Sequence, residues 1–138
     1  MTVESVRDAV DKSKELSSKT SRAAFLSDWR LQGTVLWLMY TALKGCIDLA
    51  AKLIAAVGKK TPDSYSDAFR VLGEAGVFTP DEAERFSNMA KFRNILARSY
   101  TSVNLELVYE QLQSGTVDIE TCLRKLVKEA SRHNLPLL

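Results

Sequence analysis

Apolar residues recur along this chain at the spacing of helices, and no segment alternates between apolar and polar residues as a strand would. The clearest case is the stretch from about Ser27 to Val57, where apolar residues repeat every seven positions in two neighbouring stripes. The stripes are Leu36, Leu43, Ala50 and Val57, and beside them Met39, Cys46 and Leu53. We therefore predict one long helix with a broad apolar face, ended by the glycine and proline of residues 58–62.

Shorter helices are predicted before and after this long one. The first covers about residues 3–16 and is followed by a polar, serine-rich connection at 17–22. Another covers about residues 64–74. Thr79-Pro80-Asp81-Glu82 then combines an N-cap threonine, a proline at the first helical position and a capping-box glutamate, so it starts a helix that runs to about Ser99.

The last third of the chain predicts two more helices. One starts at Asn104 and extends through Leu112 to a stop at Gly115, and the other covers about residues 119–132 with Asp118 as its cap. We therefore predict an all-α, up-and-down bundle of five to six helices. It forms a single domain over residues 1–138, with an N-terminal helix and polar connection at 1–22 and a separate long helix at 79–100.

Composition narrows the class of protein without naming a function. The 138 residues are 46% hydrophobic and 26% charged, which suits one folded domain and excludes intrinsic disorder. A net charge of +2 does not by itself argue for nucleic-acid binding. Two cysteines, Cys46 and Cys122, and a single histidine, His133, lack the spacing of a zinc site. We expect two reduced, packed thiols, no metal and no cofactor.

The chain is expected to work in the cytoplasm and away from membranes. Its first residues lack the basic-then-apolar pattern of a signal peptide. The long apolar stretch is interrupted by Lys44, Asp48 and Lys52, and a charge at the centre of a bilayer costs about 3 kcal/mol. This stretch is therefore predicted to be a core helix.

Five segments of the chain carry a more specific pattern. They are Asp48-Leu49-Ala50, Ser64-Tyr65-Ser66-Asp67-Ala68-Phe69, the continuation Arg70-Val71-Leu72-Gly73-Glu74-Ala75-Gly76-Val77, Met89-Ala90-Lys91-Phe92-Arg93-Asn94-Ile95-Leu96 and Leu107-Val108-Tyr109-Glu110. In this order and spacing they resemble the HepT-like branch of the HEPN superfamily, over about residues 31–130. The resemblance implies a metal-independent endoribonuclease, a toxin that is paired with a small nucleotidyltransferase antitoxin.

The resemblance also assigns roles to individual residues. The family's active motif is an arginine, a polar residue, three further residues, a histidine, one residue and a tyrosine. Arg93 matches the arginine, Asn94 the polar residue and Tyr100 the tyrosine, which is similar to the residue that the antitoxin adenylylates. Arg98 stands where the histidine belongs. The four residues are thus the candidate catalytic set, with Arg93 and Arg98 as candidate phosphate ligands.

The arginine at position 98 predicts impaired chemistry. Cleaving RNA without a metal needs a base for the 2′-hydroxyl proton and an acid for the leaving oxygen, and histidine serves both because it titrates near neutral pH. Arginine keeps its proton and cannot be the base. We predict that the chain binds RNA but cleaves it weakly or not at all. Arg98 is either an inactivating substitution or the natural residue of a paralogue.

Helical geometry separates the two arginines of the motif, and the family resemblance implies a dimer. At 100° per residue Arg93 and Tyr100 lie about 20° apart around the helix, whereas Arg93 and Arg98 lie about 140° apart. One helix cannot easily direct both arginines at one phosphate. Family members are described as dimers with two motif helices facing across a cleft, so we expect a composite site.

Simpler interpretations of the same residues stay open. Arg93 could be a solvated charge, Asn94 a structural hydrogen-bonding residue, Arg98 a partner for the helix dipole and Tyr100 a packed aromatic. Asp48 could orient Arg93 but more simply pairs with a lysine four residues away. We expect Trp29 and Trp37 to pack or to form dimer contacts, and Phe92 and Tyr109 to lie in the core. His133 is expected to have no catalytic role. The remaining basic residues are expected to be mostly solvated charges: Lys59, Lys60, Arg124, Lys125, Lys128 and Arg132.

The alternative functions follow from the same open points. One is a non-catalytic dimeric helical module that binds a nucleotidyltransferase antitoxin or RNA. The other is a stand-alone nucleic-acid-binding protein or adenylylation substrate without toxicity.

Overall fold

A computed structural model describes residues 3–57, 61–98 and 104–135, and all the regular elements in these ranges are helices. They are α1 (Val3–Lys19), α2 (Arg22–Ser27), α3 (Trp29–Ala56), α4 (Tyr65–Glu74), α5 (Pro80–Arg98), α6 (Leu105–Ser114) and α7 (Thr116–Arg132). The predicted all-α class is confirmed. The described part has one short helix more than the upper predicted number, because α2 forms inside what was expected to be connection and lead-in to the long helix.

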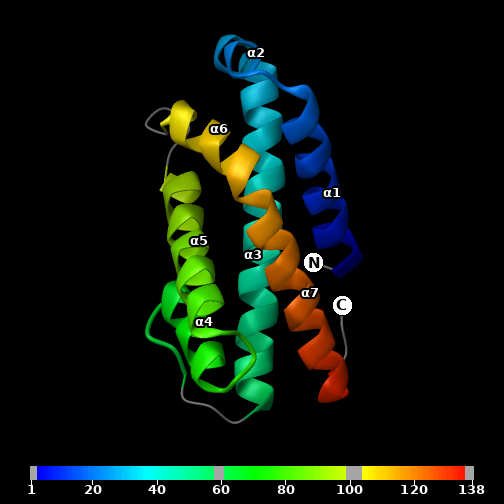
Figure 1. Cartoon of the computed structure of the whole chain (residues 1–138), viewed down its shortest axis with the longest axis vertical. Coiled ribbons are helices and arrows are strands. Elements are labelled where there is room, and N and C mark those ends of the chain that lie inside the picture. The colour runs from blue at the N-terminus through cyan, green and yellow to red at the C-terminus, as the bar shows by residue number, and fades with distance from the viewer. Residues whose placement is uncertain (1–2, 58–60, 99–103, 136–138) are drawn as a thin grey trace.

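The long helix α3 is the centre of the bundle and spans most of its length (Figure 1). Helices α1 and α7 pack on one side of it and α4 and α5 on the other, while α2 and α6 lie at the end where α3 begins. Both predicted stripes of α3 face the core, and Val57 alone among them is only half-buried. The hydrophobic pattern therefore predicted correctly which face of α3 the other helices cover.

Helix α3 also has the length and composition of a membrane span, although the bundle explains its apolar character. Within the described ranges it alone passes that test, at a mean hydropathy of 1.2, and 56% of its most apolar stretch is buried by the other helices. The expectation that Lys44, Asp48 and Lys52 make it too polar to span was therefore too strong. Its apolar residues are those of a core helix that contacts every other helix.

Local start signals predicted two of the helix starts correctly, those of α5 and α6. Thr79 Oγ1 accepts from the Glu82 backbone N–H at 3.1 Å, and Glu82 Oε1 accepts from the Thr79 N–H at 3.0 Å, which is the predicted capping box at the start of α5. Asn104, where the sequence predicted that a helix starts, caps α6 through its side-chain oxygen. Glu82 also pairs with Lys125 of α7, so the start of α5 is tied to the C-terminal helix.

Two helix boundaries differ from the prediction. Helix α1 continues through part of the serine-rich connection to Lys19, where Lys19 pairs with Glu15 at 2.7 Å. Helix α7 begins at Thr116, directly after Gly115 and without a side-chain cap, so Asp118 lies in its first turn and is not the cap. Asp118 instead faces Arg85 of α5 at 3.7 Å, a tertiary contact that the local sequence does not reveal.

Candidate functional site

Helices α3, α4 and α5 place two tyrosines around the guanidinium of Arg93. Tyr40 lies in the first half of α3, Tyr65 is the first residue of α4, and Arg93 lies near the end of α5. Arg93 Nη2 donates to Tyr40 Oη at 3.2 Å, and its Cζ lies 5.3 Å from the Tyr40 ring centre and 5.1 Å from that of Tyr65. Both rings attract the cation through their electron-rich faces. A half-buried arginine is thus held in place by aromatic rings on two other helices.

Asn94 completes the surroundings of this cation. Arg93 Nη1 donates to Asn94 Oδ1 at 3.3 Å. The Arg93 Nε–H is buried, and no hydrogen-bond acceptor meets it in the described part of the chain. Most buried donors in native proteins have a partner, so this one marks hydrogen-bonding capacity that the described protein groups leave unused.

No carboxylate pairs with Arg93 among the residues that the structure describes. The nearest candidate from the sequence, Asp48, pairs with Lys44 at 2.8 Å, so the simpler ion-pair interpretation of Asp48 is correct. That hydrogen bond and the Asp48 charge raise the pKa of Lys44, while the charge of Arg93 opposes this rise. Within the described ranges the positive charge of Arg93 thus has no carboxylate partner, which favours an anionic ligand.

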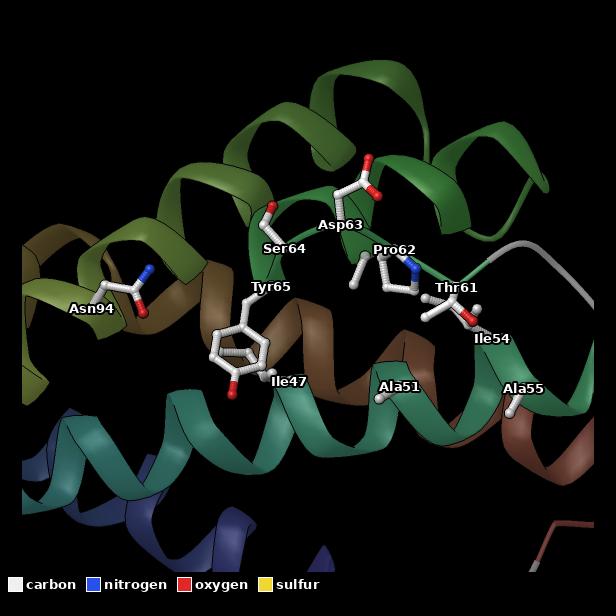
Figure 2. A pocket seen from close by; sticks show the side chains of 11 residues that line it. Ile47, Ala51, Ile54, Ala55, Thr61, Pro62, Asp63, Ser64, Tyr65 and Asn94 are labelled. Carbon is white, nitrogen blue, oxygen red and sulfur yellow. The ribbon is translucent and has the colours of Figure 1, made fainter.

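A pocket of about 550 Å³ adjoins this cation. Ile47, Ala51, Ile54 and Ala55 of α3 line one side, and residues 61–65 with Ala68 line the side of α4. Figure 2 shows Asn94 and Tyr65 at one end of the pocket and Thr61 and Ala55 at the other. Tyr65 thus contacts Arg93 and lines the pocket, so the two features are continuous.

The described residues contain part of the predicted catalytic set. Arg93 and Asn94 contact each other as expected of one site. Arg98 is the last residue of α5, but its side chain lies outside what the structure describes, and so does the whole of Tyr100. Their predicted roles stay predictions.

Tyr40 and Tyr65 are the site residues that sequence reasoning missed. Tyr65 lies in one of the segments that resemble the family, yet nothing in its local sequence indicates an arginine partner. Tyr40 lies 53 residues before Arg93 in the chain. A weak signal was available for Tyr40, since Tyr40, Lys44 and Asp48 are spaced four apart and put polar groups on one edge of an otherwise apolar helix.

Several other predicted positions can be compared with the structure. Phe92 is core, and Tyr109 is half-buried with its hydroxyl donating to the Thr20 carbonyl at 2.9 Å. Trp29 and Trp37 are 74% and 63% exposed, so neither belongs to the core of the described residues, although the Arg30 guanidinium lies over the Trp29 ring. The basic residues Arg124 and Lys128 are exposed, Arg132 and His133 lie by Glu129, Lys125 pairs with Glu82, and Lys59 and Lys60 lie outside the described residues.

The two cysteines lie in the core of the bundle. Cys46 and Cys122 are free, buried thiols, as predicted. Burial raises the pKa of the Cys122 thiol well above its ordinary value, with a further rise from the hydrogen bond with Cys46. No group of three or more potential metal ligands occurs in the ranges 3–57, 61–98 and 104–135.

Comparison with known proteins finds one family over most of the chain. A family model described as Ribonuclease HepT-like matches residues 6–126. The mRNA nuclease HepT of Shewanella oneidensis is 27% identical over 96 residues, which are 70% of this chain and 72% of that protein. A protein of Archaeoglobus fulgidus described as a putative RNase is 29% identical over 119 residues, or 86% of this chain and 87% of the relative.

Solved structures with the same fold agree with this match. A tri-AMPylated HEPN toxin of Shewanella oneidensis in complex with an MNT antitoxin superposes with a TM-score of 0.78 at 22% identity, covering 91% of this chain and 92% of that one. A toxin–antitoxin crystal structure with AMP-PNP gives a TM-score of 0.77 at 21% identity, covering 90% and 93%. At these identities the superpositions establish a common fold.

Proposed function

The chain belongs to the HepT-like ribonuclease family, as its sequence resemblance predicted, and we propose that it is the toxin half of a toxin–antitoxin pair whose Arg93 binds a phosphate of RNA. One observation supports this most directly: Arg93 is held by Tyr40, Tyr65 and Asn94 with no carboxylate partner in the described residues. A cation fixed by neutral groups keeps its full charge for an incoming phosphodiester.

One of the neutral partners, Tyr40, also provides a hydrogen-bond donor beside this charge. Tyr40 accepts a hydrogen bond from Arg93 through its hydroxyl oxygen, so its own O–H remains free to donate to a phosphate oxygen. Arg93 and Tyr40 together would stabilise the negative charge that develops on the phosphate during cleavage. This is electrostatic help to the reaction, and neither group supplies the base that it also needs.

Arg98 limits the activity we propose. The base and the acid for RNA cleavage would come from the family's histidine position, and a guanidinium at Arg98 holds its proton at any physiological pH. The chain is therefore a HEPN-type ribonuclease by descent that binds RNA and cleaves it weakly or not at all. In the alternative it serves as a non-catalytic dimeric module, with RNA or antitoxin binding as its whole function.

We place two copies of the motif helix across one composite site, in a homodimer. Exposed apolar side chains on α3 and α5, two of the three helices that form the site, support this arrangement. Trp37 lies about one turn before Tyr40 on α3 and is 63% exposed, while Ile95 follows Arg93 by two residues and is 39% exposed. Aromatic residues that are exposed in a single copy are common at the centres of interfaces.

A minimal nucleotidyltransferase antitoxin is the proposed protein partner, and Tyr100 is the residue it would adenylylate. The support is the motif position of Tyr100 and the AMPylated state of a toxin with the same fold. The reaction would transfer an adenylyl group from ATP to the tyrosine oxygen with release of pyrophosphate. We place the pair in the cytoplasm, where its RNA substrate occurs.

An RNA-cleavage assay tests the proposal. The chain as it stands, Arg98→His, and Arg98→His combined with Arg93→Gln are compared on a single-stranded RNA with a chelator present. Restoring a general acid–base group should raise the cleavage rate by roughly 10²- to 10⁴-fold, and removing Arg93 should abolish much of that gain. Arg70→His, on the exposed surface of α4, is the matched control and should leave the rate unchanged.

A measurement of RNA binding by the same variants separates a catalytic from a non-catalytic protein. Arg93→Gln should weaken RNA binding by the chain as it stands, whatever the cleavage rate. If Arg98→His stays inert while Arg93 still governs RNA binding, the non-catalytic alternative replaces the ribonuclease. If Arg93→Gln binds RNA as tightly as the unchanged chain, the phosphate-binding role is wrong.

A further inference from the structure

The pocket beside Arg93 has the size and chemistry of a site for a flat heterocycle. Its volume of about 550 Å³ lies within the range of roughly 300–1,000 Å³ that is usual for small-molecule sites. Its long side is apolar, formed by Ile47, Ala51 and Ile54 of α3 (Figure 2). Polar groups gather at the end near Asn94 and Tyr65 and along residues 61–64. A nucleobase combines an apolar face with a polar edge in the same way.

We propose that this pocket binds one nucleobase of the RNA strand whose phosphate Arg93 holds, a proposal that rests on the function proposed above. We choose a nucleobase as the ligand because the pocket is continuous with the surroundings of the Arg93 cation. Tyr65 contacts the Arg93 guanidinium with its ring and also lines the pocket, and Asn94 is hydrogen-bonded to Arg93 and lines the pocket too. The base of a nucleotide whose phosphate lies on Arg93 is therefore close to the end of the pocket that Tyr65 and Asn94 line.

Tyr65 supplies the aromatic surface of this base site. Tyr65 is 49% exposed although its ring packs against Arg93, so part of the residue remains available to a ligand. Stacking of a base on an aromatic side chain accounts for roughly a tenfold gain in affinity or more. Because every base has such a face, stacking alone would not select among bases.

Asn94 is the group that would distinguish one base from another. Its Oδ1 already accepts from Arg93 Nη1, which leaves the Nδ2 hydrogens to meet a ligand. An amide that presents donors favours a base edge that presents an acceptor, such as a ring nitrogen or a carbonyl oxygen. Asn94 is thus a specificity residue for the base as well as a partner of Arg93.

A larger side chain on the α3 side of the pocket tests the proposal without changing Arg93, Tyr65 or Asn94. Ala51 is an exposed residue of α3 that lines the pocket, so Ala51→Leu places three further carbons inside it at little cost to the helix. Ala56 is also exposed at the end of α3 but does not line the pocket, so Ala56→Leu is the matched control.

The probes are a 2′-O-methyl adenylyl-adenosine dinucleotide, which cannot be cleaved, ribose 5-phosphate, which carries a phosphate without a base, and adenosine. Affinities are measured by NMR titration of the full chain. The dinucleotide should bind roughly tenfold or more tightly than ribose 5-phosphate. Ala51→Leu should remove this advantage and the binding of adenosine while leaving ribose 5-phosphate unaffected, and Ala56→Leu should keep both.

Two results would overturn the base site. The first is a dinucleotide that binds no more tightly than ribose 5-phosphate. The second is an Ala51→Leu chain with unchanged dinucleotide affinity. If the self-association of that Ala51→Leu chain also changes in sedimentation, the pocket is a contact between two copies.

Arg93→Gln distinguishes failure of this proposal from failure of the proposed function. This substitution should weaken the binding of the dinucleotide and of ribose 5-phosphate alike and leave the binding of adenosine unaffected. If it changes neither phosphate ligand, the phosphate role of Arg93 fails, while adenosine binding and its loss in Ala51→Leu still decide the base site on their own.

Discussion

Gly73, near the end of α4, lies so close to α5 that a side chain has no room there. A Cβ atom on Gly73 would lie 2.7 Å from the Cβ of Ala83, whereas ordinary contact begins at 3.4 Å. Both atoms are fixed directly to the backbone, so neither can rotate away, and the two helices would have to separate. We therefore predict that Gly73→Ala weakens the packing that sets the distance between Tyr65 and Arg93.

The size of the effect follows from two opposing contributions. Replacing glycine by alanine inside a helix stabilises the fold by about 1 kcal/mol, and forcing a methyl group into a packed interface costs roughly 1–3 kcal/mol. Gly33→Ala isolates the first contribution, because Gly33 is exposed within α3 and a Cβ there would meet nothing within 4 Å. The free energy of unfolding should therefore be about 1–3 kcal/mol lower in Gly73→Ala than in Gly33→Ala.

Urea unfolding of both variants measures this difference, and a double-mutant cycle identifies its cause. Ala83→Gly removes the methyl group that the new side chain would strike, so it should recover the loss when it is combined with Gly73→Ala. The coupling energy should be about 1–3 kcal/mol, well above the roughly 0.5 kcal/mol of independent sites. If Gly73→Ala gains as much stability as Gly33→Ala, or the coupling is no larger than that of independent sites, the packing argument is refuted.

Three further outcomes are expected. Glu82→Gln should lower the free energy of unfolding by about 1–3 kcal/mol at neutral pH. The hydrogen bond from Lys125 depresses the pKa of Glu82, so the unchanged chain should lose this advantage over the variant as pH falls from 4.5 through the depressed value, and equal acid sensitivity would contradict the ion pair. Cys46 and Cys122 should react with a thiol reagent only on unfolding, and because the pKa of Cys122 is raised, stability should fall above pH 9.0; rapid labelling of the native chain would refute their burial. Tyr100→Phe should abolish incorporation of labelled adenylate by a partner nucleotidyltransferase, which mass spectrometry checks, and labelling at another residue would show that the assignment is wrong.

Helix starts were predictable where the stabilising contacts lie within one turn. The capping box of Thr79 and Glu82 and the cap at Asn104 each join residues two or three positions apart, so the sequence alone specifies them. The prediction of Asp118 as a cap was wrong for a related reason. Its side chain faces Arg85 of another helix, and a contact between helices leaves no local pattern in the sequence.

The candidate site was predictable only in part. The motif identified Arg93 and Asn94, because adjacent residues on one helix keep their relation wherever the helix packs. It did not identify Tyr40 or Tyr65, whose contacts with Arg93 depend on the packing of three helices. Nor did it reveal the pocket beside them, whose sides come from α3 and from the segment that leads into α4.

The sequence by itself thus determined the helical class, the buried face of α3, most helix boundaries and the family, since each depends on periodic spacing or on contacts within a turn. Only the tertiary structure decided which neutral groups surround Arg93, that Asp48 leaves its charge unpaired, and that a pocket adjoins it. The physical reason is the range of the interactions. Capping and periodicity act over a few residues, whereas cation–π contacts and cavities exist only where distant segments of the chain are packed together.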